Sequence, residues 1–101
     1  MHRHGINLPE QKITAFCERN RVAELSLFGS VLRDDFHEGS DVDFLVEFEP
    51  DSDATYFTLM EMEEELCQVT ARKADLRTPQ ELSKYIRQRV LDESVTIYVH
   101  R

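Results

Sequence analysis

Three aspartates in this sequence could together hold a metal ion for catalysis, because of their carboxylate side chains and their spacing. Asp41 and Asp43 lie two residues apart in SDVDFLV, and Asp75 follows in KADLRT. If SDVDFLV is a strand, both of its carboxylates point to one face, with Cα atoms about 6.5–7 Å apart. Carboxylate oxygens are the ligands that Mg²⁺ prefers, and Mg²⁺ completes its coordination with water and substrate phosphate. Three neighbouring negative charges also repel, which favours a bound cation.

A phosphate-binding turn is indicated upstream of these aspartates. Gly29 and Ser30 stand where an alternating segment ends and a helix is expected to begin, a place where backbone N–H groups and the helix dipole attract anions. Gly29 lets the backbone approach a phosphate without a Cβ, and Ser30 can donate its hydroxyl. Arg33 lies one helical turn further on and can reach the same side. The sequence therefore has both parts of a phosphoryl-transfer site in order: groups that donate hydrogen bonds to phosphate, followed by metal-binding carboxylates.

The strands that must position these residues are indicated by alternating apolar and polar side chains. We expect strands at 23–28, 41–48, 73–77 and 95–99, the last of them at a sheet edge. In the second strand, one face is apolar and the other has Asp41, Asp43, Leu45 and Glu47. The acidic residues are thus concentrated at one end of one face.

Helices are predicted between the strands from apolar residues at helical spacing. Asn7 and Glu10 form a capping-box-like start for a first helix, which Asn20 can end. Residues 30–35 leave room for one or two helical turns before a polar loop.

A longer helix is predicted after the turn at 50–53, with Asp53 as its cap. Its apolar stripe consists of Leu59, Met62, Leu66 and Val69. We interpret Tyr56, Phe57, Met60 and Met62 as core-filling side chains, and the run Glu63, Glu64 and Glu65 as a solvated end.

The last helix is predicted to start at Thr78, Pro79 and Glu81, which supply an N-cap, a proline at the first position and a capping-box acid. Leu82, Ile86 and Val90 form its apolar stripe. This order of elements predicts a single α/β (α+β) domain over residues 1–101.

Composition limits the partners that this chain can have. Of its 101 residues 41% are hydrophobic and 32% charged, which is a globular balance, and the net charge is −8. Wrapping a nucleic-acid backbone needs a surplus of Lys and Arg, so we expect no nucleic-acid partner. No apolar run approaches the ~20 residues that span a bilayer, and MHRHGINLPEQ lacks a signal-peptide core, so we expect no membrane partner and a cytoplasmic location.

The cysteines and histidines offer no second site. Cys17 and Cys67 lack CxxC spacing and lie among apolar residues, so we expect buried reduced thiols. His2, His4 and His100 lie near the termini, where disorder is common, and none has a Cys at zinc spacing.

The segment GSVLRDDFHEGSDVDFLVEF resembles the GSxxRG(x)nSDxDLxV signature of the minimal nucleotidyltransferase family within the DNA polymerase beta superfamily. The later KADLRT is similar to the weaker motif with the family's third carboxylate. One departure is that Asp34 stands where the family usually has a Gly after the Arg.

This resemblance implies a nucleotidyltransferase fold, with a short mixed sheet of about four strands packed with helices. It implies two Mg²⁺ ions held by Asp41, Asp43 and Asp75, and ATP as the donor substrate. Gly29, Ser30 and Arg33 would bind the nucleotide phosphates. Small members are similar to the antitoxin half of HEPN/MNT toxin–antitoxin systems, in which AMP is transferred to a tyrosine of the HEPN toxin.

Three functions remain open at the level of sequence. The first is an adenylyltransferase antitoxin that modifies a cognate HEPN toxin, with which it can form a hetero-oligomer. The second is a non-catalytic antitoxin that neutralises its toxin by binding, for which Asp34 is the only hint. The third is a transferase acting on a small molecule or an RNA end, although the chain offers no further domain to bind either. A neighbouring reading frame for a HEPN-type protein would favour the first.

Overall fold

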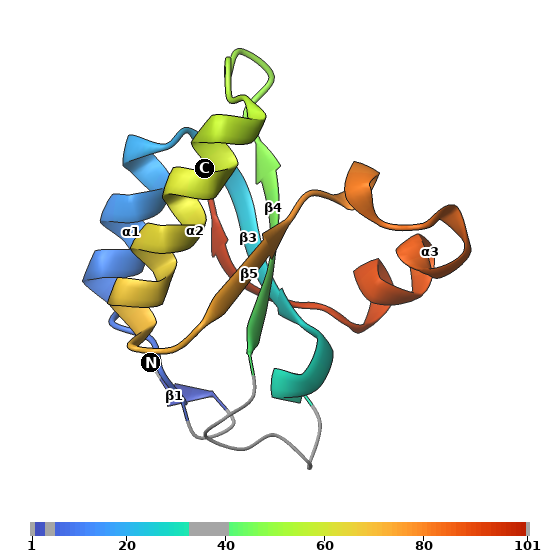
Figure 1. Ribbon diagram of the computed structural model, residues 1–101, viewed down its shortest axis with the longest axis horizontal. Helices are drawn as coiled ribbons and strands as arrows, with labels where there is room; N and C mark the ends of the chain where they lie inside the picture. Colours follow the sequence, from blue (N-terminus) through green and yellow to red (C-terminus); the bar gives the residue numbers. More distant parts are fainter. Residues whose placement is uncertain (1, 4–5, 33–40, 101) are drawn as a thin grey trace.

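The computed structural model describes residues 2–3, 6–32 and 41–100 (Figure 1). The elements in chain order are β1 (His2–Arg3), β2 (Ile6–Asn7), α1 (Glu10–Arg19), β3 (Val22–Phe28), the 3-10 turn η1 (Gly29–Leu32), β4 (Val42–Phe48), α2 (Tyr56–Thr70), β5 (Ala74–Arg77), the 3-10 turn η2 (Pro79–Glu81), α3 (Lys84–Glu93) and β6 (Val95–Val99). The four strands expected from alternation are confirmed, each within one residue at either end.

The four long strands form one mixed sheet in the order β5-β4-β3-β6. β3 is antiparallel to both β4 and β6, whereas β4 is parallel to β5. The prediction that the last strand lies at a sheet edge is confirmed. A parallel pair needs a crossover between its strands, and α2 supplies it.

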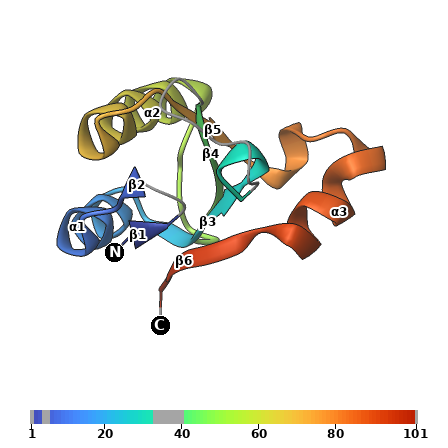
Figure 2. The ribbon, with the colours of Figure 1, turned by 90° about the horizontal axis from the view of Figure 1, so that it is seen from below.

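One face of the sheet is the core face. α1 and α2 lie side by side against it, and α3 stands on the opposite side of the sheet (Figure 2). The core consists of Leu8, Ile13, Phe16, Cys17, Val22, Leu25, Leu27, Val31, Val42, Phe44, Val46, Met62, Leu66, Ala74 and Leu76. The apolar face predicted for β4 is confirmed by Val42, Phe44 and Val46, each with no exposed surface. The acidic face of β4 therefore looks away from α1 and α2.

The starts of α1 and α2 differ from prediction. Asn7 lies in β2, which pairs antiparallel with β1, and the N-cap of α1 is Pro9 without a side-chain hydrogen bond. The two strands at 2–3 and 6–7 were not expected, because a pair of residues is too short to show alternation. Asp53 does not cap α2. Thr55 does so in a capping box with Thr58, which stands where capping boxes usually have Glu or Gln.

α3 begins later than predicted and is not part of the core. Thr78 and Glu81 do form a capping box, but it encloses only the turn η2, and α3 starts at Lys84 after the N-cap Ser83. None of the residues of α3 is buried, and Ile86 of the predicted stripe is 45% exposed. Within α3 the stripe is reduced to Ile86 and the half-buried Val90, because Leu82 precedes the helix.

A single arginine ties α3 to the preceding turn. Arg87 donates hydrogen bonds to the backbone carbonyl oxygens of Pro79, Gln80 and Leu82, at 2.7, 3.4 and 3.0 Å. Because α3 buries no side chain, these bonds are its main described connection to the turn before it.

The prediction of core-filling side chains on α2 is wrong for three of four residues. Met62 is buried, but Tyr56, Phe57 and Met60 are 70, 74 and 54% exposed. A helix that covers a sheet buries one stripe, here Met62 and Leu66, and the remaining apolar residues of its first turns face outward.

The glutamate run of α2 is not simply solvated. Glu63 accepts a hydrogen bond of 2.8 Å from the backbone N–H of Leu76, on the open edge of β5, and Glu65 forms an ion pair with Arg19 of α1. Only Glu64 fits the predicted solvated end. A side chain that occupies an edge N–H also shields the edge of the sheet from strand addition.

Both cysteines are free, as predicted. Cys17 is fully buried, and burial raises the pKa of its thiol to about 12. Cys67 is only partly buried and accepts a hydrogen bond from the backbone N–H of Ala74. Within the described ranges, no helix is both long and apolar enough to cross a bilayer.

Candidate active site

The pairing of β4 with β5 brings two of the predicted carboxylates together. Asp43 and Asp75 are direct partners in the parallel register, so their side chains share the sheet face that looks away from the core. Asp41 immediately precedes β4, two residues before Asp43, and its side chain is 45% exposed. Asp43 and Asp75 therefore share one sheet face, and the charge of Asp41 acts on Asp43 from the start of the same strand.

Gly29 lies directly against Asp43. Its φ is +76°, a left-handed conformation that favours glycine. A Cβ at this position would overlap Oδ2 of Asp43 and lie 3.2 Å from its Cγ. Phe28, the residue before Gly29, is the register partner of Asp43 on β3, which explains the close approach.

Ser30 is bonded to the same strand start. Its backbone N–H hydrogen bonds to the Asp43 carboxylate, and its hydroxyl donates to the backbone oxygen of Asp41 at 3.3 Å. The structure thus brings the predicted turn and the predicted carboxylates together. The described turn η1 is only four residues long, so a helix dipole adds little to its attraction for anions. Arg33 and Asp34 lie outside the described residues.

The site has an excess of negative charge at Asp43. Burial raises the pKa of the half-buried Asp43 carboxyl above its usual value, and the charges of Asp75 and Asp41 raise it further. The Ser30 N–H and the positive charge of Arg77 act in the opposite direction but do not cancel the increase. A cation placed here would remove the repulsion that destabilises the ionised form.

Two basic side chains that were not predicted as site residues pair with Asp75 and Asp41. Arg77 donates from Nε to Oδ1 of Asp75 at 3.1 Å and from a terminal nitrogen to Oδ2 at 3.4 Å. Nζ of Lys73 lies 3.9 Å from Oδ2 of Asp41. A signal for Arg77 was present, because residues two apart on a strand share a face.

The donor set suits a hard divalent cation. In the described part of the chain, no three His, Cys, Asp or Glu side chains converge closely enough to hold a metal ion as they stand. Asp41 and Asp75 are instead paired with Lys73 and Arg77. The carboxylate chemistry and the mutual repulsion at Asp43 nevertheless fit Mg²⁺, which takes few protein ligands and the rest from water and phosphate.

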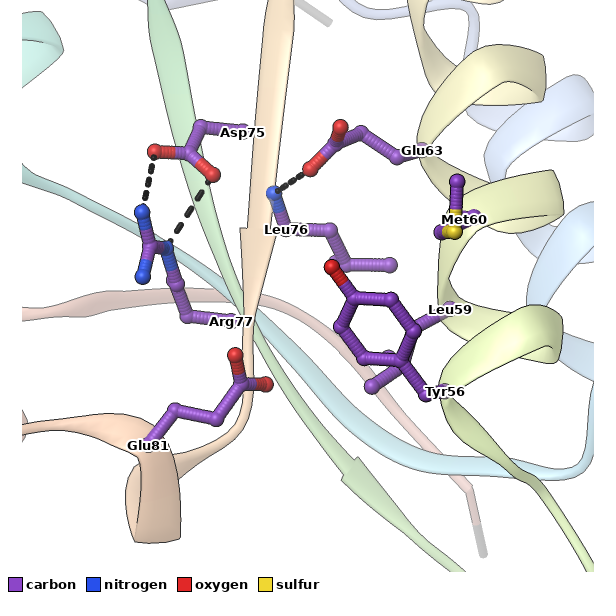
Figure 3. A pocket seen from close by; sticks show the side chains of 8 residues that line it. All are labelled: Tyr56, Leu59, Met60, Glu63, Asp75, Leu76, Arg77 and Glu81. Atoms are coloured by element: carbon purple, nitrogen blue, oxygen red, sulfur yellow. Dashed lines mark hydrogen bonds and ion pairs between the residues drawn. The ribbon is translucent and has the colours of Figure 1, made fainter.

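The carboxylates lie between two pockets. One, of about 270 Å³, is lined by Phe28, Gly29, Asp43, Ile86, Arg89, Val90 and Glu93, and so separates the sheet from α3. The other, of about 230 Å³, is lined by Tyr56, Leu59, Met60, Glu63, Asp75, Leu76, Arg77 and Glu81, and lies between α2 and β5 (Figure 3). Asp43 faces the first pocket and Asp75 the second, so the site has two distinct approaches.

Comparison with known proteins agrees with this arrangement. Residues 10–97 match the family described as Nucleotidyltransferase domain. A protein of Methanocaldococcus jannaschii named as a protein adenylyltransferase is 30% identical over 93 residues, which cover 92% of this chain and 98% of that protein.

Solved structures share the fold. A minimal nucleotidyltransferase has a TM-score of 0.70 at 27% identity, over 85% of this chain and 86% of that one. A toxin–antitoxin complex with AMP-PNP has a TM-score of 0.73 at 22% identity, over 93% of this chain and 76% of that one. A complex of tri-AMPylated Shewanella oneidensis HEPN toxin with MNT antitoxin has a TM-score of 0.64 at 20% identity, over 90% of this chain and 70% of that one.

These likenesses confirm the predicted fold class, an α+β domain with a four-stranded mixed sheet. The family match covers most of the chain, including Gly29, Ser30 and the three aspartates. This chain therefore belongs to the nucleotidyltransferase domain family.

Proposed function

We propose that this chain transfers AMP from ATP to a hydroxyl group of a partner protein, a tyrosine of a HEPN-type toxin, and thereby acts as its antitoxin. The observation that supports this most strongly is the register of Asp43 with Asp75, with the Gly29–Ser30 turn packed against Asp43. Phosphoryl-transfer sites work mainly by positioning and charge stabilisation, and this arrangement offers both.

The nucleotide is assigned to the pocket between the sheet and α3. This pocket contains Gly29 and Asp43, and a Cβ at position 29 would overlap the Asp43 carboxylate. Ser30 is adjacent and can exchange its hydrogen bonds with Asp41 and Asp43 for bonds to phosphate oxygens. Arg33 is proposed as the cationic contact of the same phosphates.

Asp75 is assigned to the acceptor. The hydroxyl oxygen attacks the α-phosphorus of ATP, the bond from that phosphorus to the bridging oxygen breaks, and pyrophosphate leaves. Asp75 orients the hydroxyl and accepts its proton. Two Mg²⁺ ions held by Asp41, Asp43 and Asp75 would neutralise the triphosphate and lower the pKa of the acceptor hydroxyl.

The choice of donor and acceptor is supported by the relatives. The name of the M. jannaschii protein indicates adenylyl transfer to protein, and the structural neighbours include a toxin–antitoxin complex with AMP-PNP and an MNT antitoxin with an AMPylated HEPN toxin. The net charge of −8 favours a basic protein surface over RNA as the partner.

The position of the label on ATP tests the reaction type. The chain should transfer ³²P to a co-produced HEPN-type protein from ATP labelled at the α-phosphate and not from ATP labelled at the γ-phosphate. Transfer from the γ-label would indicate a kinase. Labelling of tRNA ends or an aminoglycoside in place of the protein would contradict the proposed acceptor, and silencing of the toxin without any label would indicate neutralisation by binding.

A further inference from the structure

The first two turns of α2 expose an apolar patch that no described element covers. Tyr56, Phe57 and Met60 are 70, 74 and 54% exposed, although α2 already buries Met62 and Leu66 against the sheet. Folding therefore has no need for large apolar side chains at these three positions. Clustered exposed aromatic and Met side chains are characteristic of protein-binding surfaces.

This patch is continuous with the acceptor side of the proposed site. Tyr56 and Met60 line the pocket that also contains Asp75, and in Figure 3 the pocket extends around β5, with the Tyr56 ring on the α2 side of that strand and the Asp75–Arg77 pair on its other side. At about 230 Å³ the pocket has room for one inserted side chain.

The charge around the patch specifies the occupant. Glu61 and Glu64 are exposed one turn further along α2, and Glu63 and Glu81 line the pocket. Arg77 is the cation among the residues that line the pocket, and it is already paired with Asp75. An anionic group such as a triphosphate would be repelled here, whereas a surface with Lys and Arg around an apolar contact would be attracted.

We propose that Tyr56, Phe57 and Met60, here called the α2 patch, are the docking surface for the protein acceptor. The acceptor is a basic protein segment that packs an apolar side chain on the α2 patch and inserts its hydroxyl-bearing residue beside Asp75. This inference rests on the proposed function and adds to it the face through which the partner binds.

A second exposed aromatic provides a matched control. Tyr85 of α3 is 85% exposed, next to Lys84, whose Nζ lies 5.3 Å from the centre of the Tyr85 ring. Its neighbour Ile86 lines the pocket assigned to the nucleotide, on the other side of the carboxylates. Tyr85 thus matches Phe57 in exposure and helical context but lies outside the α2 patch.

Photo-cross-linking tests the contact directly. The chain is prepared with p-benzoylphenylalanine in place of Phe57 or in place of Tyr85, mixed with its HEPN-type protein and irradiated. The variant at 57 should form a covalent adduct with the partner, and the variant at 85 should not. An adduct at 85 and none at 57 would overturn the proposal, and so would the absence of adducts from both.

Kinetics test whether the contact matters for transfer. Phe57→Ser should raise KM for the partner about tenfold or more, as expected for an aromatic anchor, with little change in kcat. Tyr85→Ser should leave both constants unchanged, and both variants should keep the wild-type thermal shift with ATP and Mg²⁺. Equal KM values in Phe57→Ser and wild type would refute the docking surface while leaving the transferase intact. An adduct at 57 without any labelling would retain the surface and refute the transferase.

Discussion

Gly29 and Asp43 are in such close contact that no other residue fits at position 29 without displacing the carboxylate. The left-handed φ of Gly29 and the overlap that a Cβ would make with Asp43 Oδ2 are independent reasons for a glycine. The turn that should bind phosphates and a carboxylate that should bind metal are therefore built as one unit. A change in the turn must affect the metal ligand.

Gly29→Ala should lose nucleotide binding and stability together. The left-handed conformation of a non-glycine residue costs about 1–3 kcal/mol, and relief of the overlap requires Asp43 to move. The free energy of unfolding in urea should fall by about that amount. The thermal stabilisation by ATP with Mg²⁺ should largely disappear.

Ala71→Gly is the control for this variant. Ala71 also has a positive φ, 56°, but it is the C-cap residue of α2 and lines neither of the two pockets beside the carboxylates. Glycine there should leave stability unchanged or raise it, with a normal nucleotide response. A Gly29→Ala protein that responds to ATP and Mg²⁺ as wild type does would show that the turn is not part of the site.

Asp43→Asn should stabilise the metal-free protein while abolishing its response to ATP and Mg²⁺. Burial and the neighbouring acids raise the pKa of Asp43 above its ordinary 3.8, so the folded state takes up a proton more readily than the unfolded chain. The stability linked to this proton is present in acid and is lost as pH rises through the raised pKa. At pH 7 the variant should therefore be more stable than wild type, by less than about 1 kcal/mol at a partly exposed site.

The pH dependence distinguishes this effect from a simple change in charge. The difference between Asp43→Asn and wild type should shrink as pH is lowered toward the ordinary pKa of aspartate, because wild type is then protonated as well. Asp53→Asn, which removes an exposed aspartate outside the site, should show no such trend. Thermal denaturation of wild type and of the two variants between pH 4 and 7 measures these stability differences. Destabilisation by Asp43→Asn at pH 7 would make Asp43 a structural residue.

Arg77→Leu should strengthen metal binding in the absence of nucleotide. Arg77 competes with a metal ion for Asp75 through two hydrogen bonds, so its removal frees the carboxylate and adds one negative charge to the site. We expect the Kd for Mn²⁺, measured by calorimetry, to fall severalfold. The Arg77 and Asp75 side chains are partly exposed, so metal-free stability should change by less than about 1 kcal/mol.

Arg19→Leu, which removes an ion pair between α1 and Glu65 of α2, is the control for this variant. Unchanged Mn²⁺ affinity in Arg77→Leu would show that Arg77 does not compete with the metal ion for Asp75.

Arg87→Lys should loosen α3 without unfolding the domain. The guanidinium of Arg87 reaches three backbone carbonyls, and a single ammonium group cannot reproduce that geometry. Amide hydrogen exchange in residues 84–93 should accelerate, while exchange in β3 and β4 stays slow. Since α3 borders the pocket assigned to the nucleotide, KM for ATP should rise severalfold. Uniform acceleration across the sheet would show that Arg87 stabilises the whole domain.

The sequence was most informative where local pattern and tertiary structure agree. Alternation located β3, β4, β5 and β6, and it placed Asp43 on the face of β4 opposite the buried Val42 and Phe44. The parallel register of β4 and β5, which brings Asp75 beside Asp43, is a property of the whole sheet and cannot be derived from either strand alone.

The predictions from sequence were wrong where tertiary packing decides which apolar residues are buried. Leu82, Ile86 and Val90 have the apolar spacing of a buried stripe, but Leu82 precedes α3 and no residue of α3 is buried. Tyr56, Phe57 and Met60 have the composition of a core and lie on the surface. Apolar periodicity shows which residues could be buried, and only the tertiary arrangement decides which are.

The most direct test of transfer to a protein is the intact mass of the HEPN-type partner after incubation with this chain, ATP and Mg²⁺. The partner's mass should increase by whole adenylyl groups, and peptide mapping should place them on tyrosine. With Asp43→Asn in place of wild type, the mass should remain unchanged. A partner that keeps its original mass with the wild-type chain, under conditions in which the two proteins bind, would contradict the account.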